Sequence, residues 1–128
     1  MHSVFSDGSV WPDIRVEEAK KDGLDVIAIT EHLEYQPWKD DIPHPNRNRS
    51  YEYHSKFAKG SNIIVINGSE ITRDMPPGHS NAIFIKDANK LITDDPIDAY
   101  REARKQDAFI FWNHPYWANQ SPDASVPF

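Results

Sequence analysis

The sequence predicts an α/β fold of the barrel type, because strand-like and helix-like segments alternate along it. Four apolar segments rich in β-branched or aromatic residues are expected to form strands: 25–30 (DVIAIT), 62–71, 81–85 (NAIFI) and 108–112 (AFIFW). The first and the last are almost continuously apolar, which is typical of parallel strands covered on both faces. Two segments with apolar residues at helical spacing, 12–22 and 96–106, are expected to form helices.

The ends of both helices carry local signals. The first helix begins at Pro12 and stops before Gly23, a residue favoured just after a helix. The second begins at Pro96, where Asp94 or Asp95 can cap the first free backbone N–H groups. These signals support two helices between the strands.

The segment 34–50 breaks the alternation. It contains three prolines, two arginines and little periodicity, and irregular loops of this length within a domain are often functional. His44, Arg47 and Arg49 are candidate phosphate-binding residues, since guanidinium groups bind phosphate oxygens in pairs. The alternative interpretation, a solvated basic loop, stays open.

Composition restricts the classes of function. The 128 residues suffice for one domain, and 14 basic against 20 acidic residues leave a net charge of −6, which argues against duplex nucleic acid as a partner. The absence of cysteine excludes disulfides and thiolate metal sites and fits a cytoplasmic location, unless a leader peptide precedes Met1. No apolar run approaches the ~18 residues of a membrane span. The oligomeric state stays open.

Imidazoles and carboxylates recur where predicted strands meet loops. The candidate metal ligands are His2, Asp7, His32, Glu70, His79 and His114. Each alone could be a surface histidine, a turn residue or a salt-bridged acid. Together they are expected to converge, because the ends of parallel strands meet at one rim, where α/β barrels have their active sites. Nitrogen and oxygen ligands of this kind suit divalent zinc, manganese or iron.

These motifs resemble, in order and spacing, those of the polymerase-and-histidinol-phosphatase (PHP) family. The segments that carry the resemblance are His2 with Ser6-Asp7-Gly8, 23–32 (GLDVIAITEH), Gly68-Ser69-Glu70-Ile71, Gly78-His79 and Asn113-His114-Pro115. The resemblance implies a distorted seven-stranded (β/α) barrel with two or three divalent metals at the C-terminal ends of its strands.

The resemblance also implies a role for each ligand. Glu70 would bridge the first two metals, and His79 and His114 would complete the second. Asp7 and His32 would hold the third metal.

The sequence departs from the family pattern at three places. His2 corresponds to the second histidine of the opening His-x-His, so the first would precede Met1. The later Asp-x-His pair has no counterpart before Phe128, and Glu31 stands where aspartate is usual. We therefore expect residues 1–128 to be a single incomplete PHP domain, truncated at both ends.

The function implied is metal-dependent hydrolysis of a phosphate ester on a small phosphorylated metabolite or nucleotide. A metal-bridging hydroxide would attack, so no side-chain nucleophile is assigned. Three alternatives stay open: an amidohydrolase-type C–N hydrolase, a polymerase-associated 3′–5′ exonuclease and a catalytically inactive metal-binding fragment. Ser6-Asp7-Gly8 and Glu70 favour the PHP family over the amidohydrolases.

Overall fold

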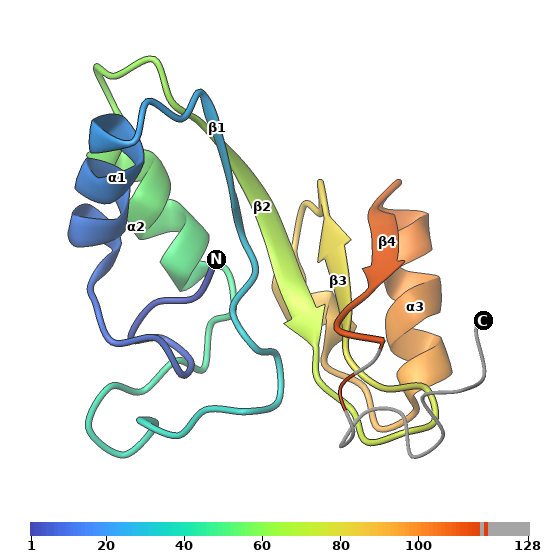
Figure 1. The fold of residues 1–128 in the computed structure, drawn as a ribbon. Coiled ribbons are helices and arrows are strands. Elements are labelled where there is room, and N and C mark those ends of the chain that lie inside the picture. The colour runs from blue at the N-terminus through green and yellow to red at the C-terminus, as the bar shows by residue number, and fades with distance from the viewer. Residues whose placement is uncertain (116, 118–128) are drawn as a thin grey trace.

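Four strands form one mixed sheet in the computed structural model, which describes residues 1–115 and 117 (Figure 1). The strands lie side by side in chain order, β1-β2-β3-β4. The elements are α1 (Pro12–Lys21), β1 (Val26–Ile29), α2 (Arg49–Phe57), β2 (Ile64–Ile71), β3 (Ser80–Ile83), the 3₁₀ helix η1 (Ala88–Leu91), α3 (Pro96–Lys105) and β4 (Phe109–Trp112). The four predicted strands and both predicted helices are therefore confirmed.

The end signals of the helices act as expected. Gly23 has a φ of 70°, which a residue without a side chain adopts without strain, and its N–H bonds to the carbonyl of Lys20 at 3.1 Å. Of the two candidate caps for α3, the structure uses Asp95, whose carboxylate accepts from the N–H of Ile97 at 2.8 Å.

Helix α2 was not predicted. Its buried residues are Ser50 and His54, both polar, so an apolar periodicity that would indicate a helix is missing. The irregular segment before it extends as far as 48, and α2 begins at Arg49.

The expectation that the strands are parallel is wrong for β3. Strand β1 pairs with β2 in parallel, but β3 is antiparallel to both β2 and β4. The connection 72–79 between β2 and β3 is shorter than the dozen or so residues that a parallel crossover requires. The chain therefore turns back directly after β2.

This arrangement still gathers the expected residues at one rim. Since β1, β2 and β4 run in the same direction, their C-terminal ends lie at the edge where antiparallel β3 begins. His79 immediately precedes β3 and therefore lies at the same rim as the residues that follow the other strands.

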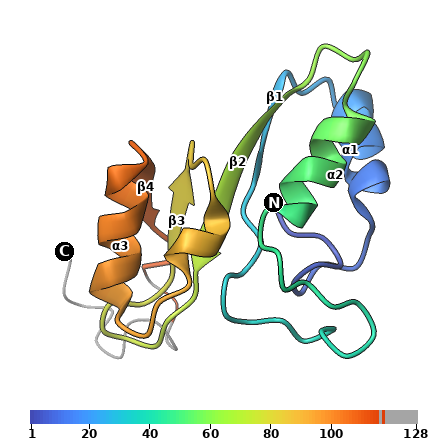
Figure 2. The same ribbon diagram turned by 180° about the vertical axis from the view of Figure 1, so that it is seen from behind.

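Two apolar clusters hold the helices against the sheet. One lies between α1, α2 and β1 and contains Val16, Ala19, Ile27, Ile29 and Ala58. The other joins η1 and α3 to β2 and β3 and contains Leu33, Ile71, Ala82, Ile85, Ala88, Leu91, Ala99 and Ala103. Figure 2 shows η1 and α3 in front of β3 and β4, on one side of the sheet.

The opposite side of β4 is open in the described part of the chain. Phe109 and Phe111 are 60% and 40% exposed, so the described residues cover only one face of this strand. None of the helices in residues 1–115 and 117 is both long and apolar enough to cross a membrane.

Gly68 tests the packing of the central strand. A Cβ at this position would lie 2.9 Å from the carbonyl oxygens of both Ile29 and Ala82. We expect Gly68→Ala to lower the free energy of unfolding by about 1–3 kcal/mol, as overpacking does, in chemical denaturation. Ile64→Thr, at a position 62% exposed on the same strand, should change it by less than ~0.5 kcal/mol. A Gly68→Ala protein as stable as the wild type would contradict this packing.

Candidate metal centre

One pocket of about 540 Å³ lies at the rim of the sheet, and all six candidate ligands line it. The remaining lining residues are Tyr35, Thr72, Asp74 and Trp117. The structure thus brings together side chains that lie up to 112 positions apart in the sequence, from His2 to His114. Their role as ligands stays a prediction.

Main-chain hydrogen bonds place His32 beside Glu70. The strand pairing of β1 and β2 continues beyond β1 as a parallel bridge between these two residues. In this bridge the N–H of Glu70 donates to the carbonyl of Glu31 at 2.9 Å, and the N–H of Leu33 donates to that of Glu70 at 2.8 Å. The positions of this imidazole and this carboxylate therefore follow from sheet formation itself.

A similar bond brings the other two histidines together. The N–H of Asn113 donates to the carbonyl of His79 at 2.9 Å, which continues the β3–β4 pairing past the end of β4. His114 then follows at the rim, with its Nε2 3.2 Å from Nδ1 of His79.

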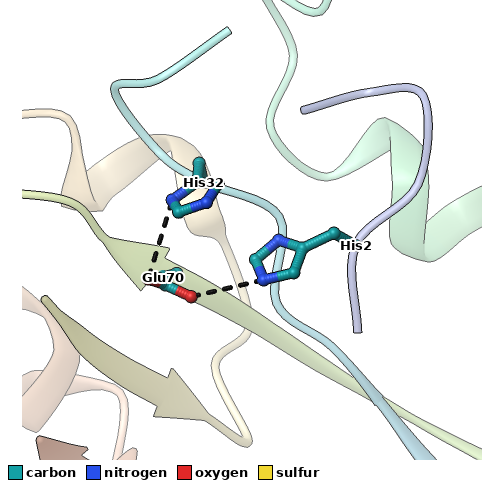
Figure 3. Close-up of side chains that lie close together, drawn as sticks. All are labelled: His2, His32 and Glu70. Carbon is teal, nitrogen blue, oxygen red and sulfur yellow. Dashed lines mark ion pairs between the residues drawn. The ribbon is translucent and has the colours of Figure 1, made fainter. Parts of the chain in front are cut away.

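The carboxylate of Glu70 is the centre of the pocket, and its side chain is only 3% exposed. Its Oε2 lies 3.4 Å from Nε2 of His2. Its Oε1 lies 3.0 Å from Nδ1 of His79, 3.6 Å from Nδ1 of His32 and 3.9 Å from Nε2 of His114. Figure 3 shows the rings of His2 and His32 turned toward this carboxylate.

The donor set fits divalent cations. Two groups of residues have ligand atoms within 4.8 Å of one another, His2–His32–Glu70 and Glu70–His79–His114, and they share the carboxylate. Among the described residues, Oε1 of Glu70 is buried without a hydrogen-bond donor in suitable geometry. A buried acceptor of this kind requires compensation, which a cation would supply. Imidazole and carboxylate together suit zinc, manganese and iron.

The protonation states also favour cation binding. Burial alone would raise the pKa of Glu70, but a hydrogen bond from His2 and the charges of His32 and His2 outweigh it and hold the pKa at about 2. Burial lowers the pKa of His32 despite the opposing charge of Glu70. An ionised carboxylate and a neutral imidazole are the forms that bind metal.

Asp7 lies at the open end of the pocket, with its side chain 42% exposed. Its Oδ2 is 3.5 Å from Nε2 of His32, and its Oδ1 is 3.7 Å from Nδ1 of His2. The rings of His2 and His32 stack with their centroids 4.6 Å apart. Asp7 therefore lies beside His2 and His32, and the ring of His32 also lies edge to face with that of His79, with the centroids 5.7 Å apart.

Glu31 is a structural partner whose role sequence reasoning missed. Its buried carboxylate accepts from the N–H of Ser3 at 3.0 Å and from the hydroxyls of Ser3, Ser6 and Ser50. Ser3 and Ser6 follow His2 in the N-terminal segment, so Glu31 fastens this segment to the chain just after β1. The short polar residues around His2 were the available signal, but their common partner depends on the tertiary fold.

The candidate phosphate-binding residues lie outside the histidine pocket. His44 and Arg47 line a neighbouring pocket of about 760 Å³, and Tyr35 belongs to both pockets. His44 is buried against the ring of Phe5, and burial lowers its pKa to about 4, so its ring is uncharged at neutral pH. The Nε of Arg47 donates to the carbonyl of Leu33 at 2.8 Å.

Arg49 is committed to other contacts. Its guanidinium lies 4.8 Å from the centroid of the Phe5 ring and donates to the carbonyl of Pro43 at 2.9 Å. It lines neither of the two pockets. A role for His44, Arg47 and Arg49 in binding phosphate stays a prediction.

The fold and the site define a mixed α/β domain whose rim carries imidazoles and carboxylates that could hold metal ions. Comparison with solved structures agrees. The chain is 55% identical to part of a two-domain protein from Bacteroides vulgatus that contains a predicted PHP-like metal-dependent phosphoesterase, with a TM-score of 0.92. The match covers 100% of this chain and 37% of that one. This similarity confirms the resemblance of the chain to the PHP family.

A second solved structure is more distant. It is a proposed metal-dependent phosphoesterase from Bifidobacterium adolescentis, 26% identical, with a TM-score of 0.53. The match covers 71% of this chain and 28% of that one. The models of protein families and the curated proteins gave no match.

Glu31 makes the stability of the metal-free protein depend on pH. Burial opposes ionisation of Glu31, but hydrogen bonds from Ser3, Ser50 and Ser6 lower its pKa below the ordinary value of 4.5. The carboxylate therefore stabilises the fold above pH 4.5, and this contribution disappears as the pH falls toward the lowered value.

We accordingly expect Glu31→Gln to be less stable than the wild type at about pH 7, with a difference that narrows as the pH falls below 4.5. Chemical denaturation in the presence of a chelator measures both proteins. A difference that stays constant over this range would show that ionisation of Glu31 does not stabilise the fold.

Proposed function

We propose that the chain supplies the metal centre of a phosphoesterase. The observation that carries this proposal is the single buried carboxylate of Glu70, shared by two groups of histidines. The description of both solved neighbours as predicted or proposed metal-dependent phosphoesterases supports it. The activity proposed is hydrolysis of a phosphate ester.

We assign the candidate ligands to two or three divalent cations, which would be zinc, manganese or iron. Glu70 offers Oε2 on the side of His2 and Oε1 on the side of His79 and His114. Asp7 and His32 face each other at the open end. When bound, such cations lower the pKa of water and neutralise phosphoryl oxygens, so a side-chain nucleophile is not required.

The substrate that we propose is a small phosphorylated metabolite or nucleotide. A pocket of about 540 Å³ has the size of a small-molecule site, and Tyr35 and Trp117 offer ring faces beside the histidines. The net charge of −6 disfavours a long nucleic acid.

We also propose that the sheet is part of a distorted barrel. The exposed aromatic rings of Phe109 and Phe111 project from β4 on a face without a helix, as residues inside a barrel would before further strands cover them. The chain spans 37% of the length of the Bacteroides vulgatus protein, which leaves room there for such strands.

Glu70→Gln tests the proposed function. The amide keeps the shape of the side chain but loses the charge that two cations would share. We expect phosphatase activity toward p-nitrophenyl phosphate and nucleoside monophosphates to fall by at least ~100-fold, and metal content by at least one ion per chain. Elemental analysis gives the metal content.

The control is Glu102→Gln, the same change at a helix surface where the carboxylate pairs with Lys105. It should retain both activity and metal. Wild-type turnover in Glu70→Gln would reject the proposed role. Hydrolysis of an amide or lactone, without activity toward phosphate esters, would favour the amidohydrolase alternative.

A further inference from the structure

The ring of His32 has two different neighbours. Its Nδ1 lies 2.6 Å from the hydroxyl oxygen of Thr72, the shortest polar contact of this ring, and 3.6 Å from Oε1 of Glu70. Its Nε2 lies 3.5 Å from Oδ2 of Asp7. A neutral imidazole carries a proton on one nitrogen and a lone pair on the other, so the partner of Nδ1 decides which nitrogen can bind a cation.

The hydrogen bonds of Thr72 indicate the direction of this contact. Its hydroxyl donates to the main-chain carbonyl of Glu70 at 3.1 Å, which uses its single proton. The hydroxyl oxygen is then an acceptor toward His32, and Nδ1 must be the donor. The lone pair of the ring therefore lies on Nε2, which faces Asp7.

The backbone of Thr72 is held in place as well. The N–H of Thr72 donates to Oε2 of Glu34 at 2.7 Å, and Oε1 of Glu34 pairs with Nε of Arg73 at 2.8 Å. Thr72 directly follows β2, so its backbone position is set by the sheet. This network fixes the backbone of Thr72 beside His32, and the bond to the carbonyl of Glu70 orients its hydroxyl.

We propose that Thr72 is a positioning residue that holds the proton of His32 on Nδ1 and thereby directs Nε2 to a cation shared with Asp7. This inference rests on the proposed metal centre and adds a division of labour within it. In this division Nε2 of His32 serves the side of Asp7, while its Nδ1, which faces Oε1 of Glu70 at 3.6 Å, carries the proton.

Removing the acceptor should reverse the tautomer. In Thr72→Val the side chain keeps its shape, but Nδ1 of His32 loses its partner in a ring that is only 8% exposed. The proton then moves to Nε2, which donates toward Oδ2 of Asp7, 3.5 Å away. A proton on Nε2 blocks the lone pair that a cation requires.

The experiment compares three variants of the protein. Thr72→Val removes the hydroxyl, and Thr72→Ser restores it. Thr93→Val is the matched control, because the Thr93 hydroxyl also donates to a main-chain carbonyl, that of Asp95 at 2.8 Å, but Thr93 does not line the pocket. Two measurements are made: the ring ¹⁵N chemical shifts of His32 in metal-free protein, and Mn²⁺ binding by titration calorimetry.

We expect wild type, Thr72→Ser and Thr93→Val to show the Nδ1–H form, and Thr72→Val to show the Nε2–H form. Thr72→Val should also weaken one Mn²⁺ site by about 10–100-fold, while its other binding remains at the wild-type level. Thr72→Ser should restore the affinity. This rescue separates positioning of the ring from a general loss of stability.

The inference is overturned if wild-type His32 carries its proton on Nε2, or if Thr72→Val leaves both the tautomer and the Mn²⁺ affinities unchanged. It is equally overturned if Thr72→Ser fails to restore the Nδ1–H form. The tautomer is measured without metal or substrate. A protein that shows the expected shifts and binding but has no phosphatase activity would therefore reject the proposed function while leaving the role of Thr72 intact.

Discussion

The buried carboxylate of Glu70 is the constraint on which the rim depends. A carboxylate that is withdrawn from water costs free energy unless charges or hydrogen bonds compensate it. Here the surrounding imidazoles outweigh the effect of burial and hold the pKa of Glu70 at about 2, so the carboxylate stays ionised. The main-chain bridge between His32 and Glu70 places this carboxylate beside an imidazole once β1 and β2 pair. Pairing of the two strands therefore also sets the positions of His32 and Glu70 relative to each other.

Two buried carboxylates lie side by side at this rim and have opposite environments. Glu31 is surrounded by hydroxyls and a backbone N–H, which satisfy its oxygens and leave it with a structural task. Glu70 faces imidazole nitrogens, and within the described residues its buried Oε1 accepts no hydrogen bond of suitable geometry, although Nδ1 of His79 lies 3.0 Å away. Protein atoms satisfy the carboxylate of Glu31, whereas the surroundings of Glu70 fit the cation that we propose. The neighbours of each carboxylate therefore distinguish the structural role of Glu31 from the proposed metal-binding role of Glu70.

The sequence predicted well those features that repeat locally. Apolar periodicity located β1 to β4, α1 and α3, and the position of histidines at strand ends located the rim. Features that depend on distant partners were missed. Helix α2 buries His54 and Ser50 instead of apolar residues, and Ser50 bonds to Glu31, which lies 19 positions earlier in the sequence. Neither the burial of these two polar residues nor the bond between Ser50 and Glu31 leaves a periodic pattern in the sequence.

The direction of β3 was predicted incorrectly, yet the position of His79 at the rim was correct. A residue after a parallel strand and a residue before an antiparallel strand occupy the same edge of a sheet. His79 comes before its strand and not after it, and β3 is antiparallel because the short connection 72–79 reverses the chain. These two differences from the expected arrangement cancel, so His79 still lies at the rim. That connection also begins with Thr72, which contacts His32. The same reversal that returns His79 to the rim therefore begins at the residue that orients His32.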